Sequence, residues 1–278
     1  DGALTEIERT LWFSHLGPVL TMPGMPCTET TACAARDANA ENTHLLSQWR
    51  AMNLATDLDS FIEAHRRWNA MPWVNTMAAS ADGRALYLDN STVGNLSEAA
   101  ISLWQERLAS DPRTANLYAE RGMILLDGSD SRFAWVDVPG TPVPGTVPFE
   151  KRPRLERRDY IFNANDSYWL TQPAAPLSGY SPLYGPEATA RSLRTRMNVQ
   201  LLAPDSPYGY AGEDGRFNRR ELQAALFSNR SLAAELLKEQ LVDACRATPA
   251  VTVAGERRDL AAACDALAAF DGRFDEDS

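Results

Sequence analysis

The stretch between Val138 and Pro153 contains six prolines and glycines, and it limits the fold more than any other feature of the chain. Proline fixes φ and lacks a backbone donor, and glycine adopts almost any backbone conformation, so neither sustains a helix or a strand. We therefore predict a long surface loop at residues 139–153. It is the main internal boundary, with strands and helices at 1–138 before it and a second section at 154–278 after it.

The spacing of apolar residues predicts an α+β fold. Apolar residues alternate with polar ones over short segments, which is typical of half-buried strands, and recur at three- and four-residue steps elsewhere, which indicates helices. The pair Asp82-Gly83 favours a hairpin between two of the strands. The expected elements are strands at 4–13, 73–77, 84–88 and 159–162, helices at 45–52 and 58–65, and mostly helix from about residue 186 onward.

Composition and charge exclude several classes of protein. The chain has 278 residues with 44% hydrophobic and 23% charged side chains, which is ordinary globular composition. Its formal net charge of −10 makes a nucleic acid an unsuitable partner, because phosphates would be repelled. No run of about 18 apolar residues occurs, so we expect no membrane span.

Four cysteines form two close pairs whose spacing matches neither a zinc ribbon nor a CxxC motif. Leu237, Leu241 and Cys245 share one face of a predicted helix, and Cys264 shares a face with Leu260 and Leu267 on the next. We therefore predict a Cys245–Cys264 disulfide, which indicates the periplasm or the extracellular space. The alternative is two buried free thiols. A second bridge is expected between Cys27 and Cys33, unless their loop leaves both thiols exposed.

Common catalytic motifs are absent from the sequence: it contains no GxSxG, HExxH, phosphate loop or GxGxxG. The imidazole bases available are His15, His44 and His65. His65 lies on the apolar stripe of its helix, which favours a core position. Ser14 and His15 do not form a dyad, because neighbouring strand residues point to opposite faces.

A cluster of amide and carboxylate side chains follows the predicted strand at 159–162, within Asn163-Ala164-Asn165-Asp166-Ser167. Neutral amide donors at a strand end suit the stabilisation of a tetrahedral oxyanion. The alternative is that these residues form only an Asx turn or a helix cap. A turn beginning at Ala164 would separate the two asparagine side chains, and we then expect Asn163 to be structural.

Three long stretches of this sequence resemble a known family of enzymes. They closely resemble the acyl-homoserine lactone and aculeacin-type acylases, which belong to the penicillin acylase branch of the N-terminal nucleophile hydrolases. The similarity covers nearly the whole chain and is loosest at residues 94–153. The stretches are RRDYIFNANDSYWLTQPAAPLSGYSPL (157–183), PWVNTMAASADGRALYLDNS (72–91) and RDANAENTHLLSQW (36–49).

This resemblance implies part of an αββα sandwich with an added, mostly helical C-terminal section. The family's large subunit begins with a serine that is nucleophile and, through its amine, base. Because Asp1 cannot be that serine, we expect an interior segment of the large subunit that is inert alone. The implied partners are the small subunit and the remaining parts of the large subunit, in a bacterial periplasmic or secreted enzyme. No cofactor is implied, although the family often holds a structural calcium elsewhere.

Site residues follow from the resemblance position by position. Asn165 matches the family's oxyanion-hole amide, Arg191 an active-site arginine, and Trp73 and Val74 the lining of the acyl pocket. No metal ligand is assigned. The implied activity is hydrolysis of the amide of N-acyl-homoserine lactones, a quorum-signal degradation. The alternative within the family is a penicillin or lipopeptide (aculeacin-type) acylase, and the alternative outside it is a non-catalytic extracellular binding module.

Overall fold

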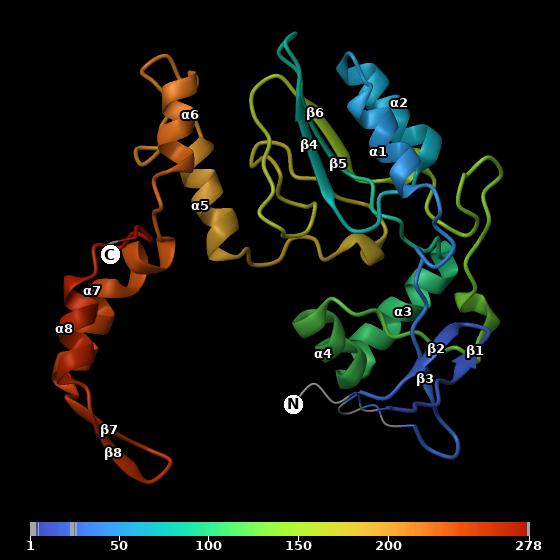
Figure 1. Ribbon diagram of the computed structural model, residues 1–278, viewed down its shortest axis with the longest axis horizontal. Helices are drawn as coiled ribbons and strands as arrows, with labels where there is room; N and C mark the ends of the chain where they lie inside the picture. The colour runs from blue at the N-terminus through green and yellow to red at the C-terminus, as the bar shows by residue number, and fades with distance from the viewer. Residues whose placement is uncertain (1–3, 5, 23–24, 26, 277–278) are drawn as a thin grey trace. The chain divides into compact units, whose positions relative to one another are not determined.

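The computed structural model describes residues 4, 6–22, 25 and 27–276 and divides the chain into two units. Unit 1 comprises Asp1–Arg158 and Leu177–Glu187, and unit 2 comprises Asp159–Pro176 and Ala188–Ser278. Helices and small antiparallel sheets occur in both (Figure 1), so the predicted α+β class is confirmed. Among the described residues, no helix combines the length and apolarity needed to cross a membrane.

Unit 1 is organised around an antiparallel sheet of order β4-β5-β6. Tyr87 at its centre is opposite Met77 on one side and Leu155 on the other. A smaller sheet of order β1-β2-β3 precedes it in the chain. The strands are β1 (Phe13–Ser14), β2 (Gly17–Leu20), β3 (Cys33–Ala34), β4 (Asn75–Ala79), β5 (Ala85–Asp89) and β6 (Arg154–Arg157).

Capping residues mark both ends of the second helix of unit 1, α2. At the start of α2, the Asp57 carboxylate accepts the backbone N–H of Ser60 at 2.7 Å, and Ser60 accepts in return, which forms a capping box. Asn69 ends the same helix in the left-handed conformation, with φ of 48°. The helices are α1 (Leu45–Asn53), α2 (Leu58–Trp68), α3 (Glu98–Ser110) and α4 (Pro112–Arg121), with the short 3₁₀ helices η1 (Ser131–Phe133), η2 (Phe149–Lys151) and η3 (Pro182–Tyr184).

A buried arginine joins distant segments of unit 1. The guanidinium of Arg152 is fully buried and donates to the carbonyl oxygens of Val147, Asn90 and Ser91 at 2.9, 2.5 and 2.9 Å. It thereby ties the end of β5 to the proline-rich loop. One apolar core cluster of unit 1 consists of Leu96, Ala100, Trp104 and Phe133.

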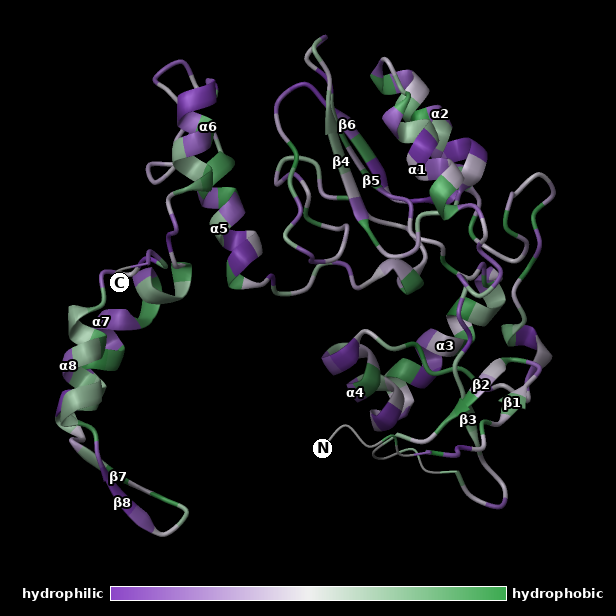
Figure 2. Cartoon of the chain, viewed as in Figure 1, coloured by the Kyte–Doolittle hydropathy of each residue, from purple (hydrophilic) through white to green (hydrophobic). Residues whose placement is uncertain are grey.

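Unit 2 is mostly helical. It contains α5 (Leu193–Leu202), α6 (Arg219–Leu226), α7 (Leu232–Ala247) and α8 (Ala261–Ala269), with a hairpin of β7 (Ala250–Val253) and β8 (Glu256–Asp259) between the last two helices. Every residue of β8 is exposed, and Figure 2 shows its hydrophilic colour against the apolar α8.

The disulfide between α7 and α8 is present as predicted, with Cys245 and Cys264 bridged at a Cα–Cα distance of 5.7 Å. The predicted seam is one residue out of register, because Leu237 and Leu241 are 46% and 51% exposed while Val242 is 7% exposed. Cys245 shares a helix face with either residue, since it follows Leu241 by four residues and Val242 by three.

The prediction of a Cys27–Cys33 disulfide is wrong, because both cysteines are free in this structure. Cys33 lies in β3 opposite Leu20, and the Sγ of Cys27 instead contacts the hydroxyl of Thr21 at 3.6 Å.

Two predicted strands are also corrected. Over 4–13, only Phe13 lies in a strand, and Ile7 and Leu11 are exposed; position 5 is outside the described residues. The end of this segment meets β2, where Phe13 pairs with Pro18 and the carbonyl oxygen of Trp12 accepts the backbone N–H of Val19 at 2.8 Å. The strand expected at 159–162 lies earlier, at β6, because Leu86 pairs with Glu156 and the sheet ends at Arg157.

Candidate functional site

The Asn163–Asp166 segment forms a tight turn held by the side chain of Asn163. The Oδ1 of Asn163 accepts the backbone N–H of Asn165 at 2.8 Å, and its Nδ2 donates to the carbonyl oxygen of Asp166 at 3.0 Å. Asn165 has φ of 61°, a left-handed conformation that asparagine tolerates better than most residues. Asn163 is thus occupied by the backbone, and the predicted separation of the two amides is confirmed.

Asn165 presents its carboxamide at the surface of unit 2. The side chain is exposed, and its Oδ1 accepts a hydrogen bond from Nη1 of Arg194 at 3.1 Å. Among the described residues, none accepts a hydrogen bond from its Nδ2. Because the arginine occupies the oxygen, the amide group is oriented with its two N–H donors free to meet a ligand.

Asp166 joins this turn to the first turn of α5. Its Oδ2 accepts from the backbone N–H of Ser192 at 3.1 Å, from the Ser192 hydroxyl at 2.8 Å and from the Thr195 hydroxyl at 2.5 Å. Partial burial raises the pKa of Asp166, but these hydrogen bonds and the charge of Arg191 outweigh it and bring the pKa below its usual value. Asp166 therefore remains a carboxylate at neutral pH.

Arg191 lies on the other side of this carboxylate. Its side chain is only 6% exposed, with Nη1 3.7 Å from Oδ1 of Asp166. The guanidinium lies 5.2 Å from the centre of the Trp169 ring, and Nε donates to the carbonyl oxygen of Thr189 at 3.0 Å. These contacts bind Arg191 to Asp166 and Trp169.

Arg194, the arginine that contacts Asn165, was not singled out from the sequence. The two arginines are three residues apart at the start of a helix, and sequence similarity alone does not distinguish them. The usable signal was Ser192, which is a good helix N-cap residue. A helix beginning after Ser192 places Arg191 outside the helix and Arg194 in its first turn.

Trp73 and Val74 precede β4 in unit 1 and are 75% and 40% exposed. Neither residue therefore belongs to the apolar core of this chain. Large exposed apolar side chains are suited to binding an apolar ligand or a covering segment.

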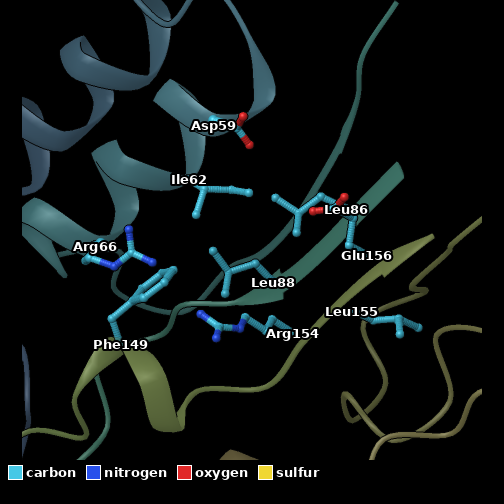
Figure 3. Close-up of a pocket in the computed structure, with 9 residues that line it drawn as sticks. All are labelled: Asp59, Ile62, Arg66, Leu86, Leu88, Phe149, Arg154, Leu155 and Glu156. Atoms are coloured by element: carbon cyan, nitrogen blue, oxygen red, sulfur yellow. The ribbon is translucent and has the colours of Figure 1, made fainter. Parts of the chain in front are cut away.

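A cavity of about 510 Å³ lies in unit 1 between α2 and the β4-β5-β6 sheet (Figure 3). Ile62, Leu86 and Leu88 contribute apolar surface to it. The guanidinium groups of Arg66 and Arg154 lie 4.9 and 5.4 Å from the ring centre of Phe149. None of the residues proposed from the sequence lines this cavity.

His65 is a core residue, as its position on the helix stripe predicted. It is fully buried, and its Nδ1 lies 3.0 Å from Nε2 of Gln48. Burial, together with the charge of Arg152, lowers the pKa of His65 to about 4, so the ring is neutral at pH 7. Ser14 is likewise structural: its hydroxyl accepts the backbone N–H of Leu16 and donates to the carbonyl oxygen of Gly17.

Throughout the described ranges, no three His, Cys, Asp or Glu side chains are grouped so that they could hold a metal ion. The candidate site thus consists of the Asn165 amide and the arginine and carboxylate that surround it.

The sequence of this chain is similar to known proteins over nearly its whole length. The model of the penicillin amidase family matches residues 1–278. Aculeacin-A acylase of Actinoplanes utahensis is 39% identical over 98% of this chain and 34% of its own length. Acyl-homoserine lactone acylase PvdQ of Pseudomonas savastanoi pv. phaseolicola is 33% identical, and that of Pseudomonas syringae pv. tomato 34%, each over all of this chain. The chain spans about a third of the length of these curated relatives.

Proposed function

Because this chain belongs to the penicillin amidase family, we propose that it is part of an enzyme that hydrolyses the amide bond of N-acyl-homoserine lactones. The products are a fatty acid and homoserine lactone. The serine nucleophile lies outside this chain, and its free α-amine serves as the base. The two units described above contribute to an αββα sandwich that other segments of the same precursor complete.

The exposed amide of Asn165 is the observation that carries this proposal. When the serine oxygen attacks the carbonyl carbon of the substrate, the carbonyl oxygen becomes an oxyanion. A fixed neutral donor stabilises that charge without titrating or repelling it. Asn165 meets this requirement, since Arg194 holds its oxygen and leaves its N–H groups available. The acyl enzyme is then hydrolysed through a second oxyanion at the same position.

The acyl chain is proposed to bind against Trp73 and Val74. Both side chains are apolar and exposed in this chain, so they are available to a ligand. Burying a fatty-acyl chain against them removes apolar surface of both partners from water.

Family membership and the disulfide also indicate the partners of this chain and the compartment in which it acts. We propose that the other chains of one processed precursor complete the enzyme and that it acts in the periplasm or outside the cell. The Cys245–Cys264 disulfide supports an oxidising compartment. We propose that Arg191 belongs to the active site, because its positive charge neutralises Asp166, the residue that follows Asn165 in the chain.

A second candidate substrate class is a lipopeptide or penicillin amide. The name of the Actinoplanes relative, an acylase of aculeacin A, favours it. The oxyanion geometry is common to all these substrates, so the pocket around the acyl chain distinguishes them.

A substrate series on the purified, processed enzyme tests the proposal. Hydrolysis of acyl-homoserine lactones of different chain length is compared with hydrolysis of a penicillin and of an acylated lipopeptide. We expect the lactones to be the best substrates and Trp73→Ala to change the preferred chain length, since each lost methylene-sized contact is worth roughly 1–3 kcal/mol. Preference for the lipopeptide would support the second candidate, and ligand binding without any hydrolysis would support a binding module.

A further inference from the structure

The network around Asp166 has a role that the proposed reaction leaves unexplained. Asp166 is the residue next to Asn165 in the chain, yet its carboxylate faces α5 and none of its described contacts reaches the Asn165 amide. Three hydrogen bonds to one carboxylate oxygen are more than a simple loop anchor requires. Each of the three donors comes from Ser192 or Thr195, within the first turn of α5.

That turn of α5 carries the arginine that contacts Asn165. Ser192 is the N-cap of α5, and its hydroxyl accepts the backbone N–H of Thr195 at 3.3 Å while donating to Asp166. Arg194 lies between these two residues. The backbone position of the arginine is therefore set by the contacts that Asp166 makes on either side of it.

We infer that Asp166 is a positioning residue for the oxyanion donor, an inference that rests on the proposed function. By holding the first turn of α5 against the turn that contains Asn165, it keeps the Arg194 guanidinium on the side-chain oxygen of Asn165. The amide then keeps one orientation, with Nδ2 directed away from the arginine. Without Asp166, the amide can rotate and present its oxygen to the oxyanion, which repels it.

Arg191 completes the arrangement. Its nearly buried guanidinium lies 3.7 Å from the second carboxylate oxygen of Asp166 and is held by Trp169. Such a neighbouring cation helps a partly buried carboxylate to remain charged. The charge of Asp166 in turn strengthens its hydrogen bonds to the two hydroxyl groups.

A double-mutant cycle on the processed enzyme tests the inference. Asp166→Asn preserves the shape of the side chain and removes its charge. We expect kcat to fall by about three- to tenfold with KM within about twofold, because the lost interaction matters in the transition state. In an Asn165→Ala background we expect Asp166→Asn to lower the residual kcat by less than about twofold, since residues that act through one another are not additive.

The matched control is Asp111→Asn at the N-cap of α4. The carboxylate of Asp111 accepts the backbone N–H of Arg113 at 3.0 Å and the hydroxyl of Thr114 at 2.8 Å, as Asp166 does at α5. We expect this variant to leave kcat unchanged. If Asp166→Asn is not processed to the mature enzyme, Thr195→Val removes one hydrogen bond to the same carboxylate and is expected to give a smaller, equally non-additive loss of kcat.

The outcomes separate this inference from the proposed function. Equal losses of kcat from Asp166→Asn in the wild-type and Asn165→Ala backgrounds would mean that Asp166 acts independently of Asn165, which overturns the inference alone. A wild-type enzyme that hydrolyses no acyl amide overturns the proposed function and the inference with it.

Discussion

The side-chain oxygen of Asn163 holds the backbone N–H of Asn165 at 2.8 Å, and this contact gives two nearby asparagines different roles. Asn163 has both ends of its amide bound to the backbone of the turn. Asn165, turned into the left-handed region, exposes its amide to solvent. The Asx-turn interpretation of this segment therefore applies at Asn163, and the oxyanion role is the one that we propose for Asn165.

Replacing Asn165 by alanine is expected to lower kcat by roughly 10²–10³, the scale for losing one oxyanion donor. Folding and KM should change little, because the side chain is exposed and accepts one hydrogen bond from Arg194. Asn165→Asp should be at least as damaging, since a carboxylate repels the developing negative charge. Steady-state kinetics with the preferred lactone measure both variants.

Asn163→Ala is the comparison for this prediction. It removes two hydrogen bonds from the turn and should lower the free energy of unfolding by about 1–3 kcal/mol. Loss of turnover in Asn163→Ala together with an active Asn165→Ala enzyme would reverse the assignment of the two residues.

The two arginines near the turn are expected to differ in their effects on kinetics and stability. Arg194→Ala removes a charged donor to Asn165 and should lower kcat by about tenfold or more. Arg191→Ala leaves Asp166 without its nearby cation and should chiefly lower the melting temperature, with a smaller loss of kcat. Measuring kcat and Tm for both variants checks this order, and a larger kcat loss in Arg191→Ala would contradict it.

The four cysteines should fall into two classes, two free thiols and two cysteines joined in a disulfide. Alkylation of the denatured, unreduced protein followed by mass spectrometry should label Cys27 and Cys33 and leave Cys245 and Cys264 linked. Reducing that disulfide, whose cysteines are 19 residues apart, should destabilise the α7–α8 pair by about 3 kcal/mol. Detection of a linked Cys27–Cys33 peptide would restore the bridge expected from the sequence.

His65 should make stability depend on pH. Its pKa is about 4 in the folded protein and about 6.5 when unfolded, so between these values the unfolded chain binds a proton that the folded chain does not. The free energy of unfolding should therefore fall as the pH drops from about 6.5 to about 4, by up to roughly 3 kcal/mol. Melting temperatures across this range should decrease more steeply for the wild type than for His65→Gln, which cannot titrate. If the melting temperatures of the two proteins fell equally with pH, protonation of His65 would not be the cause of the pH dependence.

Helices and the central hairpin were predictable because their signals are local. The apolar stripe through Leu58 and Ile62 and the Asp57 cap lie within one segment, and α2 forms there. The Asp82-Gly83 turn likewise joins two adjacent strands, β4 and β5. Each signal lies within the segment that it organises.

Strand pairing and helix register were not predictable in the same way. A strand is stable only beside a partner, and the pairing of Leu86 with Glu156 joins residues that are far apart in the chain. The alternation at 4–13 is equally favourable as a local pattern, yet within its described residues only Phe13 lies in a strand. At α7, adjacent stripes through Leu241 and Val242 are both apolar, and only packing against α8 selects the second.

The sequence by itself determined the α+β class, the first two helices, the central hairpin and the Cys245–Cys264 bridge, because propensity, periodicity and motif are properties of short segments. Only the tertiary structure decided which arginine meets Asn165. Ser192 marks the start of α5 locally, but the contact of Arg194 with Asn165 joins residues 29 positions apart, and the Asp166 carboxylate holds the two segments together by binding Ser192 and Thr195.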